Sequence, residues 1–312
     1  MGSVVVSVDA ELGWGFHDQR SPPSDRARAG RNGWRRLLDL FDEHEIPATW
    51  AVVGHLFLSS CDRRHREIPA PMGWFHSEQN GLLADPELRY APELVGATVN
   101  ADVDHDVGIH TFSHVQFGSL ETSTALARAE VDAAVEVARR AGIDPVSFVF
   151  PRNDIGHLDV LAESPIECYR GHRPDQRGEV SQKLGKFRDA TIGPRTPTLV
   201  EPSVDGNGLV NVPASLFLYG FEGLTRTLAA TVREDPVVAK VRRGLEAASS
   251  SDGILHLWLH PNNLVSRRHV DRMARICELV GDYSDRGEVS IRTMRDVAEQ
   301  ARQRGPTPTT GD

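Results

Sequence analysis

The sequence predicts an α/β protein in which parallel strands form a central sheet and helices cover its outside. The first observation is an alternation of strand-like and helix-like patterns, which is typical of βα units. The second is the length of 312 residues, which is long for one ordinary domain but common for a single α/β barrel. The third is the composition, with 25% charged and 39% hydrophobic residues, which indicates a globular chain.

Short apolar runs mark the expected strands, and longer amphipathic runs mark the helices. The expected strands span residues 3–8, 48–54, 105–109, 146–150, 166–169, 209–213, 253–259 and 288–291. The expected helices span residues 25–44, 119–141, 157–163, 223–248, 267–281 and 293–303. Gly142 is expected to end the second of these helices, because glycine commonly stops helices. The tail, 305–312, is rich in proline and threonine and is predicted to be disordered.

The first strand ends in two acidic residues. Val4 to Val8 read as a buried strand, and Asp9 and Glu11 follow, separated by Ala10. Carboxylates next to a buried strand are costly unless they are hydrogen-bonded, paired or bound to a metal. The alternative is that the strand simply leaves the core there and both acids are solvated.

Two histidines follow the third expected strand. His110 and His114 are four residues apart, a spacing that places both imidazoles on one face of a helical turn, within reach of one cation. Thr111 and Ser113 between them suit a tight corner from strand to helix. A histidine pair alone is weak evidence in a chain with 13 histidines, so this motif needs an acidic third ligand.

Further segments follow in the order of a known family. Residues 35–54 show a helix pattern and then a strand pattern, 147–153 read Ser-Phe-Val-Phe-Pro-Arg-Asn, and 257–261 read Leu-Trp-Leu-His-Pro. With the two acids and the histidine pair, they make the chain resemble the polysaccharide deacetylases (carbohydrate esterase family 4, chitooligosaccharide deacetylase homology domain). The resemblance implies a distorted (β/α) barrel of about seven parallel strands. It also implies one catalytic domain, 1–304, with a long loop insertion at about 59–100.

The resemblance implies a site for one divalent metal ion, with Glu11, His110 and His114 as ligands. Zn²⁺ is expected, and Co²⁺, Mn²⁺ and Fe²⁺ are alternatives that bind similar ligand sets. The commonest first motif in this family has two adjacent acids, whereas Ala10 separates them here. The assignment of Glu11 as ligand and Asp9 as base therefore stays open to an exchange of the two roles.

The resemblance also implies the catalytic groups. Asp9 is expected to act as general base and His260 as general acid, while Arg152 pairs with Asp9 and keeps it ionised. A structural histidine in a capped turn is the alternative for His260. His256 precedes His260 by four residues on the same strand, so alternation places both on one face, and we expect His256 behind the site.

Substrate contacts are expected from Trp14, Trp74 and Asn153. The long segment 59–100 carries the pair Trp74-Phe75, which predicts a lid or a platform for a sugar ring; a surface loop packed on itself is the alternative. A local basic pocket could hold a phosphate on a carrier, with the side chains of Arg170, His172 and Arg173.

The function that these features predict is a hydrolase of linear amides that removes an N-acetyl group from an amino sugar in carbohydrate metabolism. The substrate is expected to be small or carrier-linked, such as an intracellular glycan precursor. One alternative keeps the site and changes the substrate, as in a deformylase of a formamido sugar or an allantoinase-like amidohydrolase. The other is a glycan-binding relative without catalysis. Acetate, formate or no release from a panel of amino sugars separates these possibilities.

Composition narrows the class further. The net charge of −9 and the lack of a basic stripe argue against a nucleic-acid partner. Cys61, Cys168 and Cys277 are far apart and odd in number, so neither a disulfide framework nor a cysteine zinc motif is expected. No signal peptide pattern precedes Val4 and no apolar run is long enough to span a membrane, so a cytoplasmic protein is expected. The sequence does not indicate whether the protein is a monomer or an oligomer.

Overall fold

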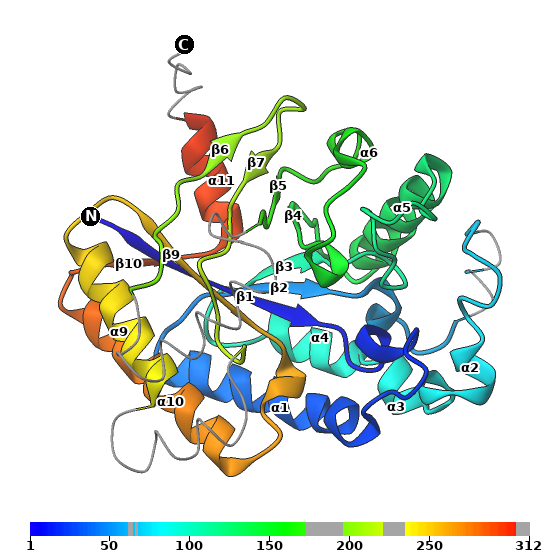
Figure 1. The fold of residues 1–312 in the computed structure, drawn as a ribbon, viewed down its shortest axis with the longest axis horizontal. Coiled ribbons are helices and arrows are strands. Elements are labelled where there is room, and N and C mark those ends of the chain that lie inside the picture. Colours follow the sequence, from blue (N-terminus) through cyan, green and yellow to red (C-terminus); the bar gives the residue numbers. More distant parts are fainter. Residues whose placement is uncertain (62–64, 66–67, 173–195, 221–234, 304–312) are drawn as a thin grey trace, which may run out of the picture.

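The computed structural model describes residues 1–61, 65, 68–172, 196–220 and 235–303. Within them, one curled sheet forms the centre of the molecule, and helices surround it (Figure 1). The expected α/β class with a mainly parallel sheet is therefore confirmed.

The sheet contains every strand that the sequence predicts. Its expected strands are β1 (Ser3–Ala10), β2 (Thr49–Val52), β3 (Asp106–Ile109), β4 (Ser147–Phe148), β5 (Cys168–Tyr169), β7 (Val210–Asn211), β9 (Ile254–Leu259) and β10 (Ser290–Arg292). Two strands of two residues each, β6 (Ser203–Val204) and β8 (Leu216–Phe217), complete it. The order is β6-β7-β5-β4-β3-β2-β1-β9-β8, with β10 also paired to β1. Among the described strands, only the β6–β7 pair is antiparallel.

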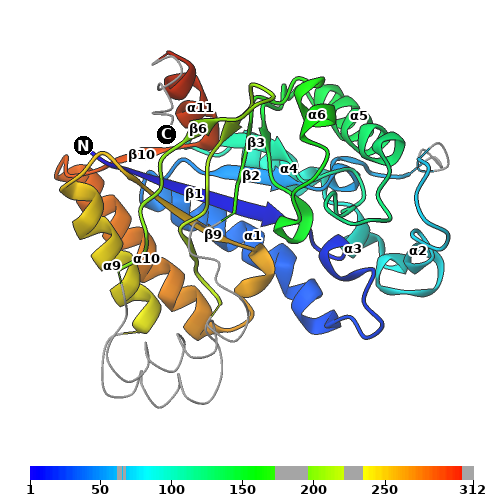
Figure 2. The same ribbon diagram turned by 45° about the horizontal axis from the view of Figure 1, so that its top comes forward.

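One chain segment joins the two ends of the curled sheet. The β7 end of this segment pairs with β5, and its β8 end pairs with β9. Between them, the Val212 amide donates to the Tyr169 carbonyl, and the Ser215 amide donates to the His256 carbonyl. The segment therefore changes partners within a few residues, and the sheet curls into the distorted barrel that the sequence predicts. Figure 2 shows β1 and β9 side by side at its centre.

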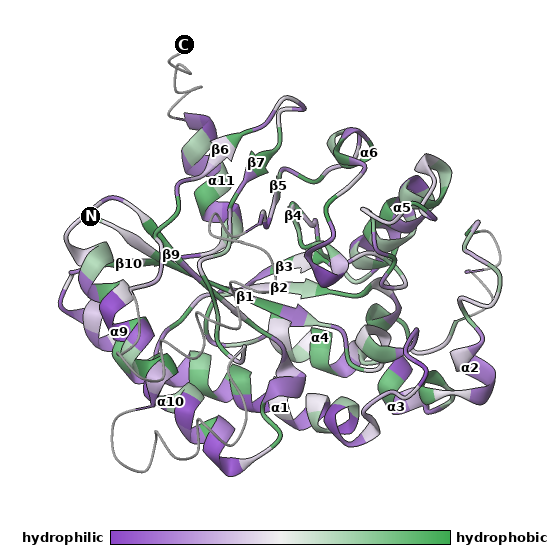
Figure 3. Cartoon of the chain, viewed as in Figure 1, coloured by the Kyte–Doolittle hydropathy of each residue, from purple (hydrophilic) through white to green (hydrophobic). Residues whose placement is uncertain are grey.

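The helices also lie close to their predicted positions. They are α1 (Ser24–Glu43), α5 (Thr124–Arg140), α6 (Leu158–Ala162), α9 (Pro236–Ser249), α10 (Arg267–Asp285) and α11 (Met294–Gln303). Helix α1 buries Trp34, Leu37 and Phe41 against the sheet, and the Trp34 and Trp50 rings stack with centroids 5.2 Å apart. Apolar faces turned inward and polar faces turned outward recur on the long helices (Figure 3).

The segment 59–100 differs from the expected loop. Its described part contains α2 (Ser77–Asn80), α3 (Pro86–Arg89) and α4 (Pro92–Val99). Prolines at the first turns of α3 and α4 fit helix starts, because proline lacks only an amide that is unpaired there. The tail predicted to be disordered and residues 223–234 of one expected helix lie outside the described residues. No helix in the described ranges combines the length and apolar character that a membrane span requires.

Candidate metal and catalytic centre

The polar side chains of the candidate site come from the carboxyl ends of different strands. Asp9 and Glu11 lie at the end of β1, and His110 directly follows β3. Arg170 directly follows β5, and His260 directly follows β9. Because these strands run parallel, their carboxyl ends lie at one edge of the barrel, which is where α/β barrels assemble sites.

Glu11, His110 and His114 form a buried cluster at this edge. Glu11 Oε2 lies 3.1 Å from His114 Nε2 and 3.6 Å from His110 Nε2. One ligand atom from each residue lies within 4.8 Å of the other two. All three side chains are almost fully buried, so water does not stabilise the carboxylate. Burial alone would raise the pKa of Glu11, but His260, His110 and His114 lower it well below its ordinary value.

The histidine tautomers fit a bound cation. The His110 Nδ1–H donates to the Val149 carbonyl over 2.8 Å, which leaves the lone pair of Nε2 facing the cluster. That Nε2 atom is buried and has no hydrogen-bond partner among the described residues. Burial lowers the pKa of His114, which favours the neutral imidazole that metals bind. Two imidazoles around one carboxylate are a donor set that suits a divalent metal.

The histidine motif is not the helical turn that the spacing predicted. Thr111 and His114 both have positive φ angles, of 59° and 66°, so the chain bends sharply twice between the two histidines. Glu130 of α5 holds this bend, because its Oε2 accepts the amides of Phe112 and Ser113 at 2.9 and 2.7 Å. The two imidazoles therefore converge through a loop anchored by a buried carboxyl group. The sequence indicated convergence but not its cause.

Asp9 is bound by Arg170. The guanidinium donates to both carboxylate oxygens, from NH1 to Oδ1 over 2.6 Å and from NH2 to Oδ2 over 2.7 Å. Arg170 is fully buried and Asp9 is 3% exposed, so the pair is shielded from water. Burial alone would raise the pKa of Asp9, but the Arg170 charge outweighs it and the pKa is lowered. Asp9 is thus a carboxylate under ordinary conditions.

The expected pairing of Arg152 with Asp9 is therefore wrong. Arg152 follows β4 in a short 3-10 turn and donates to both oxygens of Asp18, at 2.6 and 2.8 Å. Its side chain is 38% exposed, whereas that of Arg170 is fully buried. The expectation that Arg170 could hold a phosphate is also wrong, because its guanidinium is committed to Asp9. Arg173 lies outside the described residues, and His172 bonds to the Asn153 carbonyl.

Further contacts fix Arg170. Its NH1 donates to Ser7 Oγ over 3.1 Å, and its NH2 donates to Asn153 Oδ1 over 2.8 Å. Its Cζ atom lies 4.4 Å from the centroid of the Trp258 ring, which is a favourable cation–π distance. Such a buried guanidinium needs most of its donors satisfied. The position and charge of Asp9 are therefore set by several groups, not by a single pair.

His256 lies behind this pair, as the sequence predicted. Its Nδ1 is 3.0 Å from the Pro213 carbonyl, which can only accept, so Nδ1 carries the proton. Its Nε2 then accepts from Ser7 Oγ over 2.9 Å, and Ser7 in turn accepts from Arg170. Burial lowers the pKa of His256 to about 3, so the ring stays neutral in this chain of hydrogen bonds.

His260 points at both carboxylates. Its Nε2 lies 3.7 Å from Asp9 Oδ2 and 3.7 Å from Glu11 Oε1. The backbone of the following turn is capped separately, because the His260 amide donates to Asn263 Oδ1 over 2.8 Å. The imidazole is 18% exposed, more than the other histidines of the site. It can therefore contact both the buried carboxylates and an incoming molecule.

Sequence reasoning missed two supports of Glu11. Asn262 donates from Nδ2 to Glu11 Oε1 over 3.2 Å, so the turn after His260 also orients the carboxylate. Gly15 lies against Glu11 so closely that a Cβ at that position would overlap the carboxylate. The run Gly13-Trp14-Gly15 and the pair Asn262-Asn263 were the available signals, but neither specifies a contact.

The expected substrate residues differ in position. Trp14 is fully buried, donates to the Arg89 carbonyl and stacks on His55, so its expected contact with substrate is wrong. Trp74 is half-buried and donates to Ser113 Oγ over 3.0 Å, beside the histidine bend. Asn153 binds Arg170. Contacts of Trp74 and Asn153 with substrate stay predictions.

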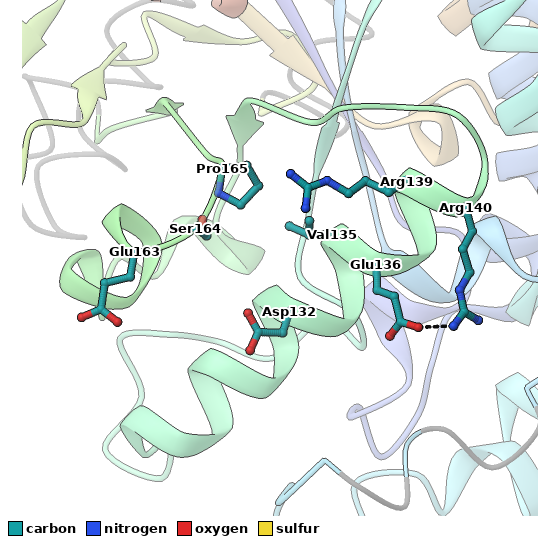
Figure 4. A pocket seen from close by; sticks show the side chains of 8 residues that line it. All are labelled: Asp132, Val135, Glu136, Arg139, Arg140, Glu163, Ser164 and Pro165. Atoms are coloured by element: carbon teal, nitrogen blue, oxygen red, sulfur yellow. Dashed lines mark hydrogen bonds and ion pairs between the residues drawn. The ribbon is translucent and has the colours of Figure 1, made fainter.

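A groove on the other side of α5 is unrelated to this site. Its volume is about 570 Å³, and Figure 4 shows that its walls come from α5 and from the segment after α6. The side chains are mostly charged, and Glu136 and Arg140 pair with each other along α5. None of the residues discussed above lines this groove.

The sequence model of the polysaccharide deacetylase family matches residues 22–158. The resemblance that the motifs predicted is confirmed by this match. The matched span contains both histidines of the cluster, whereas Asp9, Glu11 and His260 lie outside it. Among curated proteins, none matches this sequence significantly.

Solved structures share the fold over nearly the whole chain. A Mycobacterium smegmatis protein assigned to the polysaccharide deacetylases is 18% identical, with a TM-score of 0.63, over 99% of this chain and 93% of that one. A Pseudomonas aeruginosa PAO1 protein with the same assignment is 13% identical, with a TM-score of 0.60, over 98% and 92%. Puue allantoinase is 12% identical, with a TM-score of 0.61, over 98% and 91%. At such identities these likenesses show the fold alone.

Proposed function

Starting from the polysaccharide deacetylase family, whose sequence model matches residues 22–158, we propose that this chain is a metal-dependent hydrolase that removes an N-acetyl group from an amino sugar. One observation carries the proposal. The buried cluster of Glu11, His110 and His114 lies beside an ionised Asp9, and the His260 ring faces both carboxylates. A ligand set, a base and an acid are thus assembled at one edge of the barrel.

Glu11, His110 and His114 would hold the metal. Two imidazoles and one carboxylate suit Zn²⁺, and Co²⁺, Mn²⁺ and Fe²⁺ bind similar sets. When bound, such an ion polarises the acyl oxygen and lowers the pKa of a water molecule at the site. Glu11 suits the ligand role better than Asp9, because both oxygens of Asp9 are engaged by Arg170. The Val149 carbonyl fixes the His110 ring, so little reorganisation is needed on binding.

Asp9 accepts the proton of the attacking water. Its oxygens keep lone pairs beyond the two that accept from Arg170, and Oδ2 faces His260 across the site. The lowered pKa keeps the base ionised at neutral pH, which is the form that can take a proton. Ser7 and Asn153 hold Arg170, so they preserve this charge state through the arginine.

His260 donates a proton to the leaving nitrogen. Amide cleavage adds the water oxygen to the acyl carbon and breaks the C–N bond, and the nitrogen leaves readily only once it is protonated. The His260 ring packs against the stacked Phe217 and Trp258 rings, with centroids 5.6 Å from each. The products are acetate and a free amino sugar. The Trp74 ring beside the histidine bend offers an apolar face to the sugar, which can be free or carrier-linked.

The experiment is a product assay on a substrate panel. The purified chain, supplied with Zn²⁺, is incubated with N-acetylated amino sugars, N-formylated amino sugars and allantoin, and acetate, formate and ring opening are measured. We expect acetate release that Asp9→Asn abolishes. Formate alone would favour the deformylase, and ring opening of allantoin alone would favour the allantoinase-like alternative. Glycan binding without any product would show a non-catalytic relative.

A further inference from the structure

A second group of metal-ligand side chains lies outside the catalytic centre. His55 follows β2, and Cys61 and His65 belong to the segment 59–100. Cys61 Sγ lies 3.0 Å from His65 Nδ1 and 3.5 Å from His55 Nε2. One ligand atom from each of the three residues lies within 4.8 Å of the others. The sequence predicted no cysteine metal motif, and this cluster arises only in the fold.

The His55 tautomer directs a lone pair toward the sulfur. The His55 Nδ1–H donates to the Phe112 carbonyl over 2.9 Å, so Nε2 carries the lone pair that faces Cys61. His55 is fully buried, and burial lowers its pKa to about 3. The ring is therefore neutral, which is the form that binds metals.

His65 lies between the sulfur of Cys61 and the carboxylate of Glu78. Its Nε2 lies 3.6 Å from Glu78 Oε2, while its Nδ1 faces Cys61. The side chain of Glu78 is only 9% exposed, and its Oε1 has no hydrogen-bond partner among the described residues. That orphaned oxygen lies 3.8 Å from His55 Nε2 and thus faces the cluster. Metal-bound histidines commonly direct their second nitrogen to such a carboxylate or carbonyl.

Aromatic rings hold both imidazoles in place. The Trp14 ring stacks on His55 with centroids 4.1 Å apart, and the Phe75 ring lies 4.4 Å from the His65 ring. These contacts restrict both rings before any ligand binds, and a preorganised site binds more tightly.

We propose that Cys61, His55 and His65 bind a second metal ion of the zinc class, through Sγ, Nε2 and Nδ1 respectively. Zn–S and Zn–N bonds of ordinary length place tetrahedral S and N ligands about 3.6 Å apart. The distance of 3.5 Å from the sulfur to His55 Nε2 is close to that value, and the distance of 3.0 Å to His65 Nδ1 is shorter.

The site has a structural consequence for the catalytic edge. Phe112, whose carbonyl accepts from His55, lies between the two histidines of the catalytic centre. Phe75, which packs on His65, follows Trp74. A metal here would fasten the segment 59–100 to the histidine bend. The role of this ion would therefore be to hold Trp74 in place.

The experiment measures metal stoichiometry and the cobalt spectrum of the whole chain. We expect wild type to bind two equivalents of Zn²⁺. The Co²⁺-loaded protein should show a near-ultraviolet thiolate-to-cobalt band, which the thiol-free catalytic cluster cannot produce. Cys61→Ala should lose this band and one equivalent. Cys277→Ala removes a buried thiol of α10 and is the matched control, which should lose neither.

Two further variants keep the test decisive. His110→Ala/His114→Ala should retain the band and one equivalent, so the second site is read even if the proposed catalytic function is wrong. His65→Ala should weaken cobalt binding at the Cys61 thiolate. This variant replaces Cys61→Ala in the test if Cys61→Ala fails to fold. A single equivalent in wild type without a thiolate band overturns the proposal. So does alkylation of Cys61 at the same rate with and without added Zn²⁺, because a metal-bound thiolate is protected.

Discussion

A buried arginine lowers the pKa of the carboxylate at the centre of the site. Arg170 engages both oxygens of Asp9, and no water reaches the pair because both side chains are buried. Without a cation, burial would favour the protonated acid, which cannot accept a proton from water. The arginine would therefore keep Asp9 in the ionised form that the proposed base requires.

Replacing Arg170 should shift the acid limb of the pH–rate profile. In Arg170→Met the desolvation of Asp9 remains while the compensating charge is lost, so the pKa of Asp9 rises. Arginine next to an aspartate lowers its pKa by about 1–3 units, so the acid limb of kcat/KM should move up by a similar amount. Arg152→Met, which removes the exposed partner of Asp18, is the matched control and should leave the limb in place. If the acid limb shifted in Arg152→Met and not in Arg170→Met, Arg152 would be the residue that keeps Asp9 ionised.

His260 should matter most for substrates with poor leaving groups. His260→Ala should strongly slow amide hydrolysis and flatten the basic limb of its profile, because the leaving nitrogen is no longer protonated. An acetyl ester of an acidic phenol needs no such proton, so its hydrolysis should fall much less. His157→Ala, which removes a histidine bound to the Thr122 carbonyl, serves as control. Equal losses on the amide and the ester would contradict the general-acid role.

At the scale of elements, the bend that carries the two histidines depends on α5. Glu130 reaches from that helix and accepts the Phe112 and Ser113 amides and the Ser113 hydroxyl. Burial raises its pKa to about 7, although these hydrogen bonds oppose the rise. The folded state therefore binds the proton of Glu130 more tightly than the unfolded state does.

This raised pKa predicts how stability depends on pH. The contribution of protonated Glu130 is fully present below its unfolded pKa of about 4.3 and is lost as pH rises toward 7. Glu130→Gln imitates the protonated acid, so the difference in unfolding free energy between pH 5 and 8 should shrink. Glu130→Ala should be less stable at every pH and bind metal more weakly, because two buried amides lose their acceptor. Denaturant unfolding at several pH values checks both, and an unchanged pH dependence in Glu130→Gln would exclude this account.

The sequence predicted elements better than contacts between them. Apolar runs located eight of the described strands, including the two-residue strands β4, β5 and β7, whereas the equally short β6 and β8 were not predicted. Both Arg152 and Arg170 follow strands, so both reach the catalytic edge. Asp9 takes the arginine of β5 and not that of β4, although neither strand pairs with β1. That choice depends on how the sheet curls, which local patterns do not encode. The burial of Trp14 could not be predicted for the same reason, because segments that are distant in the sequence cover it.

At the scale of the molecule, barrel closure brings the parts of the site together. The segment from β7 to β8 joins the sheet ends beside His256, and α1 packs on the turn after His260. A Cβ at Gly33 of α1 would overlap the Pro261 carbonyl, so this helix can approach the turn only because glycine is there. Segments that are far apart in the chain thus fix the groups of the candidate site, which explains why the motifs are scattered along the sequence.

Trp74 should affect substrate binding more than chemistry. Trp74→Ala removes the ring beside the histidine bend, so KM for the amino sugar should rise while hydrolysis of a small acetyl ester stays nearly unchanged. Steady-state kinetics on both substrates provide the check. If both reactions decline equally, Trp74 supports the bend through Ser113, and the sugar platform would be excluded.

Metal affinity and turnover in two isosteric variants test the central claim most directly. Asp9→Asn should keep the affinity of wild type for Zn²⁺, measured against a competing chelator, and lose most turnover, because a base is removed and no ligand. Glu11→Gln should lose both, because a ligand carboxylate becomes an amide. The contrary result, with metal retained in Glu11→Gln and lost in Asp9→Asn, would show that the two acids have exchanged roles.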